Sequence, residues 1–328
     1  MGSSELFTKI INHFIIKKIY LKMYLFMKKT LLTFLIYLKR TRLFFLMVLV
    51  FWSGYEAHNN KIFPIKRFIE KKLGINNSAQ LHYENKIPPI TKINYNSDIS
   101  DKVIVKCPKR EDALIVIGFG QSNSANHTGH RFNSEDNSII NFWDGVCFQA
   151  KDPMIGATGY QGSIWIPLAK KLRKKKGQKI VVATFGVQGT FIQQWLEDKE
   201  LTKFYDFNLF KLKKAYSYPD TAFWIQGENE INTNPTDLRK YYNKFFSQFL
   251  SKFPKTSLYV TGTSYCNGIQ NKNVIKIQKE TAEKSGAIYV GETDSILGAK
   301  FRYDDCHYSE KGVDELSSML ARKYNENR

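Results

Sequence analysis

Ile117–Asn126 reads IGFGQSNSAN and continues the apolar run Ala113–Ile117. The run has the length and composition of a buried strand. Gly118 and Gly120 allow the sharp turn that follows it. Ser122 is therefore expected where the chain leaves the carboxyl end of a strand, the usual place for active residues in open α/β sheets. Taken alone, the stretch fits an ordinary strand-to-loop turn equally well.

Two later stretches favour a functional interpretation. Near the C-terminus, Asp304 and His307 stand in a D-x-x-H arrangement. A serine hydroxyl is a poor nucleophile until a base removes its proton, and a histidine held by a carboxylate is the standard base. The second stretch, Trp224–Asn229 (WIQGEN), ends another apolar run and brings the amides of Gln226 and Asn229 to the same edge of the expected sheet.

These stretches resemble the SGNH hydrolase superfamily and, within it, the sialate O-acetylesterase-like carbohydrate esterases. That group is marked by a G-Q-S-N block, a W-x-Q-G-E block and a terminal D-x-x-H, which occur here in this order. A further block matches Phe185–Thr190, followed by Trp195. The resemblance spans roughly Asp112 to Ala321. The chain departs from the pattern at Gln188, where glycine is common, and at Glu230, where aspartate is usual.

The catalytic residues expected from the motifs and the resemblance are Ser122, Asp304 and His307, with no metal and no cofactor. The expected oxyanion donors are the backbone N–H groups of Ser122 and Gly189 and one side-chain amide. The superfamily pattern G-x-N selects Asn229 for that amide, whereas the sialate esterase-like pattern selects Gln226.

Three further residues of these blocks are candidates for substrate binding: Gln121, Asn123 and Glu228. For Glu228, a structural role in holding the loop around Ser122 and a solvent-facing position are the alternatives. In the terminal block, Asp305 is a rival to Asp304, but the three-residue spacing to His307 favours Asp304 as the orienting acid.

Strands alternate with helices along the rest of the chain, which predicts a parallel sheet with helices on both faces. The predicted fold is a three-layer α/β/α sandwich with a central sheet of about five strands, as the resemblance also implies. The expected strands are 113–117, 179–185, 221–226, 257–263 and 287–291, and the expected helices are 163–176, 203–216, 235–253, 273–284 and 309–324.

Residues 123–162 are predicted to form a long irregular segment, since Asn, Gly and Asp are frequent there. Trp143, Phe148, Asp152 and Tyr160 within it could line a sugar pocket, because aromatic faces and carboxylates suit carbohydrate. For each of them taken singly, ordinary loop packing is the simpler interpretation.

The positive charge is uneven along the 328 residues, whose net charge is +19. The first 110 residues carry 20 basic and 6 acidic side chains, and the remainder carries 29 and 24. Interleaved apolar residues in the basic part favour a membrane surface over nucleic acid. The sequence predicts an N-terminal membrane-associated or signal-anchor region (1–58), a linker (59–110) and an esterase domain (111–328).

Within the N-terminal region, the apolar run Leu43–Trp52 follows Lys39, Arg40 and Arg42. It is too short for a full span, but its length and basic flank suit a signal peptide or a short signal-anchor. With the positive charge kept inside, the esterase domain would be exported to the periplasm or the cell exterior. The alternative is an amphipathic region that lies on the inner leaflet.

The four cysteines, Cys107, Cys147, Cys266 and Cys306, form no C-x-x-C pair, which makes zinc or thioredoxin-type chemistry unexpected. Their even number permits disulfides in an exported protein, but their pairing cannot be read from the sequence.

The expected function is removal of O-acetyl groups from a carbohydrate. Two alternatives remain: an O-acetyltransferase that acts on envelope polysaccharide, and a glycan-binding module with a decayed site. The complete set of serine, histidine and aspartate disfavours the binding module. The absence of an apolar lid disfavours a lipase.

Overall fold

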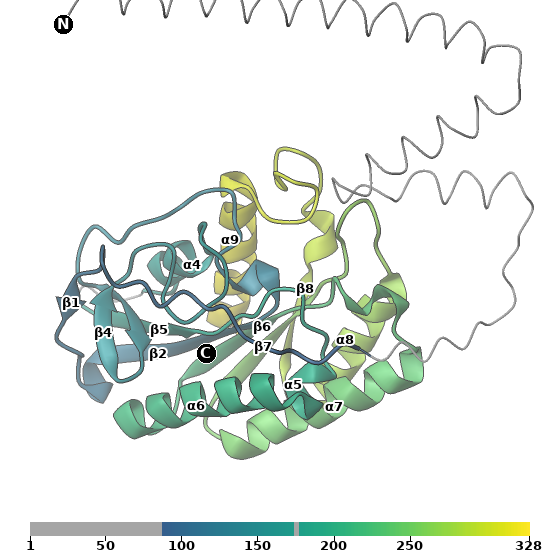
Figure 1. Ribbon diagram of the computed structural model, residues 1–328, viewed down its shortest axis with the longest axis horizontal. Coiled ribbons are helices and arrows are strands. Elements are labelled where there is room, and N and C mark those ends of the chain that lie inside the picture. The colour runs from purple at the N-terminus through teal and green to yellow at the C-terminus, as the bar shows by residue number, and fades with distance from the viewer. Residues whose placement is uncertain (1–86, 174–176) are drawn as a thin grey trace, which may run out of the picture. The chain divides into compact units, whose positions relative to one another are not determined.

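Strand β2 (Ala113–Gly120) lies near the middle of an eight-stranded sheet, and all eight of its residues are buried. The computed structural model describes residues 87–173 and 177–328 (Figure 1). The sheet order is β1-β4-β3-β5-β2-β6-β7-β8. The other strands are β1 (Ile104–Val105), β3 (Ile139–Trp143), β4 (Val146–Gln149), β5 (Lys179–Thr184), β6 (Thr221–Ile225), β7 (Ser257–Gly262) and β8 (Ile288–Glu292).

Helices cover both faces of this sheet, as Figure 1 shows. Helices α4 (Trp165–Leu172) and α9 (Glu310–Glu326) pack in the core on one face. The other face carries α5 (Gln194–Glu197), α6 (Lys199–Tyr216), α7 (Pro235–Lys252) and α8 (Lys272–Ser285). The five predicted strands correspond to β2 and β5–β8, which are parallel to one another, so the predicted three-layer α/β/α sandwich is confirmed.

Helix ends follow local capping chemistry. The side chain of Asn234 accepts a hydrogen bond from the N–H of Thr236, and Pro235 begins α7. Ser309 caps α9 by accepting from Gly312. Asparagine, serine and first-turn proline are the residues expected at these positions, because each compensates for N–H groups that have no partner within the helix.

The segment 123–162 is more regular than the sequence analysis expected, since it contains the hairpin β3–β4. Its turn is Asp144-Gly145, and both residues have positive φ, 48° and 86°. An Asp-Gly pair between apolar runs is a strong signal for a tight hairpin. The surrounding Asn- and Gly-rich sequence obscured this signal. The hairpin adds two strands to the five predicted, and β1 in the predicted linker adds a third.

The part of the predicted linker that the structure describes packs against the domain. The ring of Tyr95 lies 4.9 Å from that of Trp143, and Asn96 exchanges backbone hydrogen bonds with Gly156 and Ala157. Further along, β1 pairs with β4, and Cys107 is disulfide-bonded to Cys147. We call residues 88–96 the strap. The domain thus begins before residue 111, whereas the predicted region 1–58 lies outside the described residues.

No helix within residues 87–173 and 177–328 is both long enough and apolar enough to cross a membrane. The apolar run Leu43–Trp52, on which the signal-anchor prediction rests, lies outside these residues.

Candidate active site

The site lies at the carboxyl edge of the sheet, where the chain order reverses around β2. The chain passes from β2 through β3 and β4 to β5 on one side, and then to β6 on the other. A crevice at such a switch point is the usual ligand site of open α/β sheets. Ser122 begins a short 3-10 turn, Ser122–Ser124, directly after β2, and only 5% of its surface is exposed.

His307 and Asp304 form a close pair on the loop before α9. The Nδ1 atom of His307 lies 2.6 Å from Oδ2 of Asp304. The other carboxylate oxygen accepts the backbone N–H groups of His307 (2.7 Å) and Cys306 (3.0 Å). Burial raises the pKa of Asp304, but these hydrogen bonds outweigh it and hold the pKa below its usual value. The ionised carboxylate thus fixes the imidazole with Nε2 free for proton exchange.

Asp305 faces away from this pair. It adopts a positive φ of 64°, and its carboxylate accepts a hydrogen bond from the hydroxyl of Tyr265. The neighbouring Cys306 is disulfide-bonded to Cys266. Buried Arg302 donates to the carbonyls of Cys306 and Ile296. Sequence analysis missed Arg302 and the disulfide pairing, which together hold the D-x-x-H turn in place.

The serine loop and the histidine loop meet through a buried asparagine. Nδ2 of Asn123 lies 3.4 Å from the carbonyl oxygen of Cys306 and 2.5 Å from Oε1 of Glu228. Gln121 is buried as well, and its Oε1 accepts the N–H of Gly227. The side chains of Gln121, Asn123 and Glu228 are thus buried and connect the loops of the site, and their binding to substrate stays a prediction.

The two candidate amides for the oxyanion site have different environments. Gln226 is fully buried, and its oxygen accepts Trp195 Nε1 at 2.9 Å while its nitrogen donates to Glu230 at 2.8 Å. Asn229 is partly exposed, and its Nδ2 donates one hydrogen bond, to the carbonyl of Gly189 at 2.6 Å. The second N–H of this amide is left to bind an oxyanion. Gly189 has a positive φ of 70°, a backbone conformation that glycine favours. From these environments we expect Asn229 to be the oxyanion donor and Gln226 to support the scaffold.

We expect Asn229→Ala to lower kcat on an acetyl ester by about 100- to 1,000-fold, the usual effect of removing one oxyanion donor. Its unfolding midpoint should stay close to that of the unmodified protein, since the side chain makes one hydrogen bond at the surface. Gln226→Ala should instead lower the midpoint, because it removes one buried hydrogen-bond partner from Trp195 and one from Glu230. Steady-state kinetics and urea unfolding of both variants check this assignment. Equal losses of kcat in the two variants, without loss of stability in either, would contradict it.

A second histidine lies beside the catalytic candidates. The ring of His127 stacks on that of His307, with centroids 5.5 Å apart and planes inclined by 26°. Burial, followed by repulsion from His307, lowers the pKa of His127 to about 4. His127 is therefore neutral at pH 7, and its Nε2 has no hydrogen-bond partner among residues 87–173 and 177–328. No motif in the sequence indicated His127, since it lies in the irregular stretch after the serine loop.

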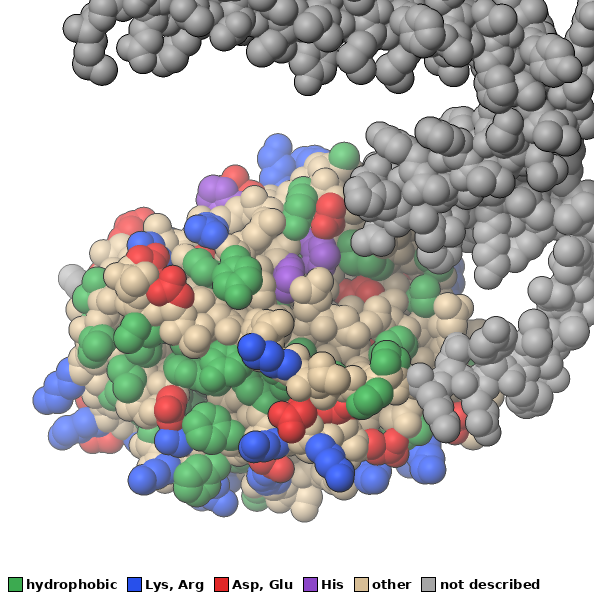
Figure 2. Space-filling model, viewed as in Figure 1, with side chains coloured by type: hydrophobic (Ala, Val, Ile, Leu, Met, Phe, Trp, Pro, Cys, Tyr) green, Lys and Arg blue, Asp and Glu red, His purple; other side chains and the backbone are tan. Residues whose placement is uncertain are grey.

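A hollow of about 500 Å³ opens beside Gly189 and His127. The strap forms one wall, and its Lys92 makes no ion pair with any residue that the structure describes. Figure 2 shows histidine side chains in the upper half of this face, and mostly uncharged side chains at its centre. The lining contains no carboxylate; it consists of Ile90, Lys92, Ile93, Asn94, His127, Thr158, Gly159, Tyr160, Gln161, Val187, Gln188, Gly189, Thr190 and Gln194.

Of the four residues considered for a sugar pocket, Tyr160 alone lines this hollow. Trp143 packs on Tyr95 and Phe204, and Phe148 is buried. Asp152 is also buried, where it accepts hydrogen bonds from Ser163 and Phe132. Ordinary packing is therefore the correct interpretation for these three.

Glu230 supports the scaffold as a buried acid. Its Oε1 accepts hydrogen bonds from Ile192 and Gln226, whereas its Oε2 has no partner in the part of the chain that the structure describes. Burial raises the pKa of Glu230 to about 7, against the effect of these hydrogen bonds. Because the folded state holds this proton more tightly than the unfolded state, the protein loses stability as the pH rises from about 4.5 to about 7.

We expect Glu230→Gln to remove this pH-dependent loss. The free energy of unfolding of the variant minus that of the unmodified protein should be about 3 kcal/mol larger at pH 8 than at pH 4. Urea unfolding of both proteins at the two pH values measures this change, and titrations shared by both cancel in the difference. If the free-energy difference between the variant and the unmodified protein were the same at both pH values, Glu230 would titrate normally.

Comparisons with known proteins bear on this site. A family model described as carbohydrate esterase, sialic acid-specific acetylesterase, matches residues 113–326. A protein of Arabidopsis thaliana, 16% identical, aligns with a TM-score of 0.51 over 66% of this chain and 98% of its own. No curated protein sequence matches the chain.

Two further solved structures align less closely. A peptidoglycan O-acetylesterase, 17% identical, gives a TM-score of 0.37 over 46% of this chain and 48% of its own. A lipase/acylhydrolase from Enterococcus faecalis, 13% identical, gives 0.41 over 65% and 96%. Of the three structures, the Arabidopsis protein is the one whose alignment shows a shared fold.

Proposed function

Since the chain belongs to the carbohydrate esterase family of sialic acid-specific acetylesterases, we propose that it removes O-acetyl groups from a carbohydrate by a serine, histidine and aspartate mechanism. The observation that carries this proposal is the 2.6 Å pair of His307 and Asp304, on a loop that contacts the serine loop through Asn123. Such a pair can activate a neighbouring serine for acyl transfer.

In the proposed reaction, Nε2 of His307 takes the proton of Ser122 as the serine oxygen attacks the ester carbonyl. The backbone N–H groups of Ser122 and Gly189 and the amide of Asn229 stabilise the oxyanion. The sugar hydroxyl leaves with the proton from His307, and water then releases acetate from Ser122 by the same steps. Asp304 holds the imidazole tautomer and stabilises the imidazolium.

A carbohydrate is the proposed substrate because of the chemistry of the hollow next to Gly189. Its lining combines a tyrosine ring with the amides of Asn94, Gln161 and Gln188. Amides can both donate to and accept from sugar hydroxyl groups. The absence of lining carboxylates also leaves an acidic sugar without charge repulsion.

The test is to incubate the purified protein with a panel of acetyl esters, including acetylated sugars, with and without a free sugar acceptor. The proposal expects release of free acetate from the sugars, with little effect of the acceptor. Acetyl transfer to the acceptor would indicate the transferase alternative. Sugar binding without turnover would indicate a binding module and overturn the esterase proposal.

We also propose that the catalytic domain is exported and associated with a membrane through the N-terminal region. The two disulfides, Cys107–Cys147 and Cys266–Cys306, support export, because disulfides persist in oxidising compartments. The basic-then-apolar sequence Lys39–Trp52 supports the membrane association. Cell fractionation with thiol alkylation tests both: the protein should be in the membrane fraction with no free thiol. A soluble, uncleaved protein with reactive thiols would contradict both.

A further inference from the structure

A second hollow lies on the other side of Tyr160 from the one described above. It measures about 490 Å³ and is lined by residues 128–131 and 160–162. Tyr160 and Gln161 line both hollows, so the tyrosine stands between them. Its side chain is 64% exposed, although an aromatic ring is stabilised by burial. Packing therefore does not explain why a tyrosine occupies this position.

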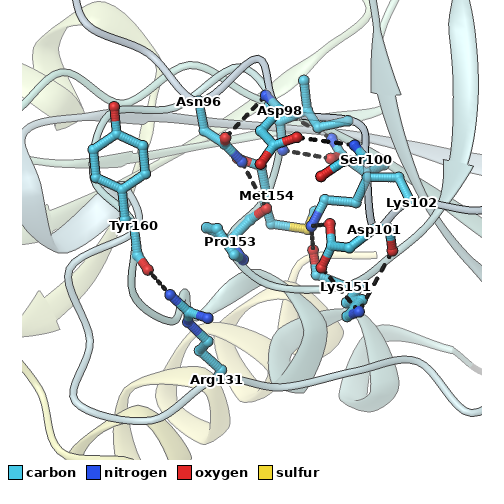
Figure 3. Close-up of polar contacts among 12 residues, drawn as sticks. Asn96, Asp98, Ser100, Asp101, Lys102, Arg131, Lys151, Pro153, Met154 and Tyr160 are labelled. Atoms are coloured by element: carbon cyan, nitrogen blue, oxygen red, sulfur yellow. Dashed lines mark hydrogen bonds and ion pairs between the residues drawn. The ribbon is translucent and has the colours of Figure 1, made fainter. Parts of the chain in front are cut away.

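The backbone that carries Tyr160 is firmly held. The N–H of Gln161 donates to the carbonyl of Asn126 at 3.0 Å, and that of Thr158 donates to Gly186 at 3.0 Å. A Cβ atom at Gly159 would lie 2.4 Å from the Asn126 carbonyl oxygen, so any residue other than glycine would clash with the backbone at this position. In Figure 3 the Tyr160 ring lies apart from the polar contacts of residues 96–102, and the Tyr160 carbonyl accepts a hydrogen bond from the guanidinium of Arg131.

This arrangement suits a ligand that passes over the ring. A tyrosine on a fixed backbone offers a large contact surface and has only two side-chain torsions to order when it binds. The apolar face of a pyranose ring can stack on the tyrosine, while its hydroxyl groups reach polar side chains on both sides. Exposed Gln188 and Asn94 are available in the first hollow, and exposed Arg131 and Gln161 in the second.

We propose that the two hollows and Tyr160 form one cleft that binds two or more consecutive sugars of a glycan chain. The acetylated sugar occupies the hollow beside Gly189, and its neighbour in the chain stacks on Tyr160 and extends into the hollow beside Arg131. The substrate is thus an oligosaccharide or polysaccharide rather than a free monosaccharide. That the bound sugar is acetylated and is the substrate rests on the proposed function, whereas the binding of a glycan chain in the cleft does not.

The catalytic test compares Tyr160→Ala, Tyr160→Phe and the control Phe210→Ala. Phe210 is a matched control because it is 62% exposed and lines neither hollow. The substrates are a chemically O-acetylated linear glucose oligosaccharide, the acetylated monosaccharide and p-nitrophenyl acetate. Tyr160→Ala should lower kcat/KM on the oligosaccharide about tenfold, through KM, and should lower it much less on p-nitrophenyl acetate, which has no sugar ring to stack on the tyrosine. Tyr160→Phe should retain the activity on the oligosaccharide because it keeps the ring, and Phe210→Ala should match the unmodified protein on all three substrates.

A binding measurement separates this proposal from the proposed function. Calorimetric titration with the non-acetylated oligosaccharide requires no turnover, and Tyr160→Ala should bind it about tenfold more weakly than Phe210→Ala. Equal affinities of these two variants would overturn the cleft, as would equal kcat/KM of the unmodified protein on the acetylated oligosaccharide and monosaccharide. Normal oligosaccharide binding without hydrolysis of any ester would overturn the proposed function and leave the cleft standing.

Discussion

Replacing Ser122 by alanine should abolish turnover of acetyl esters and leave the fold intact. The hydroxyl is the proposed nucleophile, and loss of a serine nucleophile lowers kcat by about a million-fold in a well-studied serine hydrolase. The serine turn does not depend on this hydroxyl. It is held by backbone hydrogen bonds from Ser124 to Gln121 and from Ala125 to Ser122, each of 2.9 Å. Kinetics on p-nitrophenyl acetate and the urea unfolding midpoint measure the two expectations.

Ser124→Ala is the matched control for this prediction. Ser124 lies in the same turn and is fully buried, and its hydroxyl donates to the carbonyl of Gln121 at 2.7 Å. Its loss should lower stability by about 1 kcal/mol and retain most of the activity. Turnover by Ser122→Ala at the rate of the unmodified protein would show that another residue is the nucleophile.

The second large effect concerns the histidine loop. His307→Ala should lower kcat/KM the most, Asp304→Asn less, and Asp305→Asn much less than either. His307 carries the proton, so its loss removes the base outright. Asp304 acts through the histidine: an amide in its place can favour the wrong imidazole tautomer, which costs about 10,000-fold in a serine protease. Asp305 hydrogen-bonds to Tyr265 instead, and its loss leaves the pair intact.

Asp305→Asn serves as the control for Asp304→Asn, because the two changes are chemically identical at adjacent positions. Measuring kcat/KM of the three single variants on one acetyl ester gives the order directly. If Asp305→Asn were the more damaging aspartate change, Asp304 would not be the orienting acid, and its hydrogen bond to His307 would not be the one that supports catalysis.

Much of the fold follows from local sequence signals. Each predicted parallel strand is a short apolar run that ends in glycine or polar residues. The predicted helices have an apolar face, and α6, α7, α8 and α9 begin at a side-chain cap. These signals are strong because burial and capping act over a few neighbouring residues. The D-x-x-H pair is equally local: Asp304 and His307 are three residues apart, and one turn of the chain brings them together.

Features that depend on distant contacts could not be predicted in this way. The choice between Gln226 and Asn229 depends on whether Trp195 and Glu230 occupy the amide of Gln226. The strap resembles a linker in sequence, and its position is fixed by contacts with residues 48 to 108 positions later, from the Tyr95–Trp143 ring contact to the hydrogen bond from Ile90 to Asp198. Likewise, His127 becomes part of the site through its stacking on His307.

The assignment of Ser122 as the nucleophile is tested most directly by identifying the residue that reacts with a fluorophosphonate, a reagent that traps serine nucleophiles. Inactivated protein is digested, and the modified peptide is located by mass spectrometry. We expect one modification, on Ser122, in proportion to the activity lost, and none in His307→Ala under the same conditions. Inactivation with the label on any other residue would contradict the assignment of Ser122 as the nucleophile.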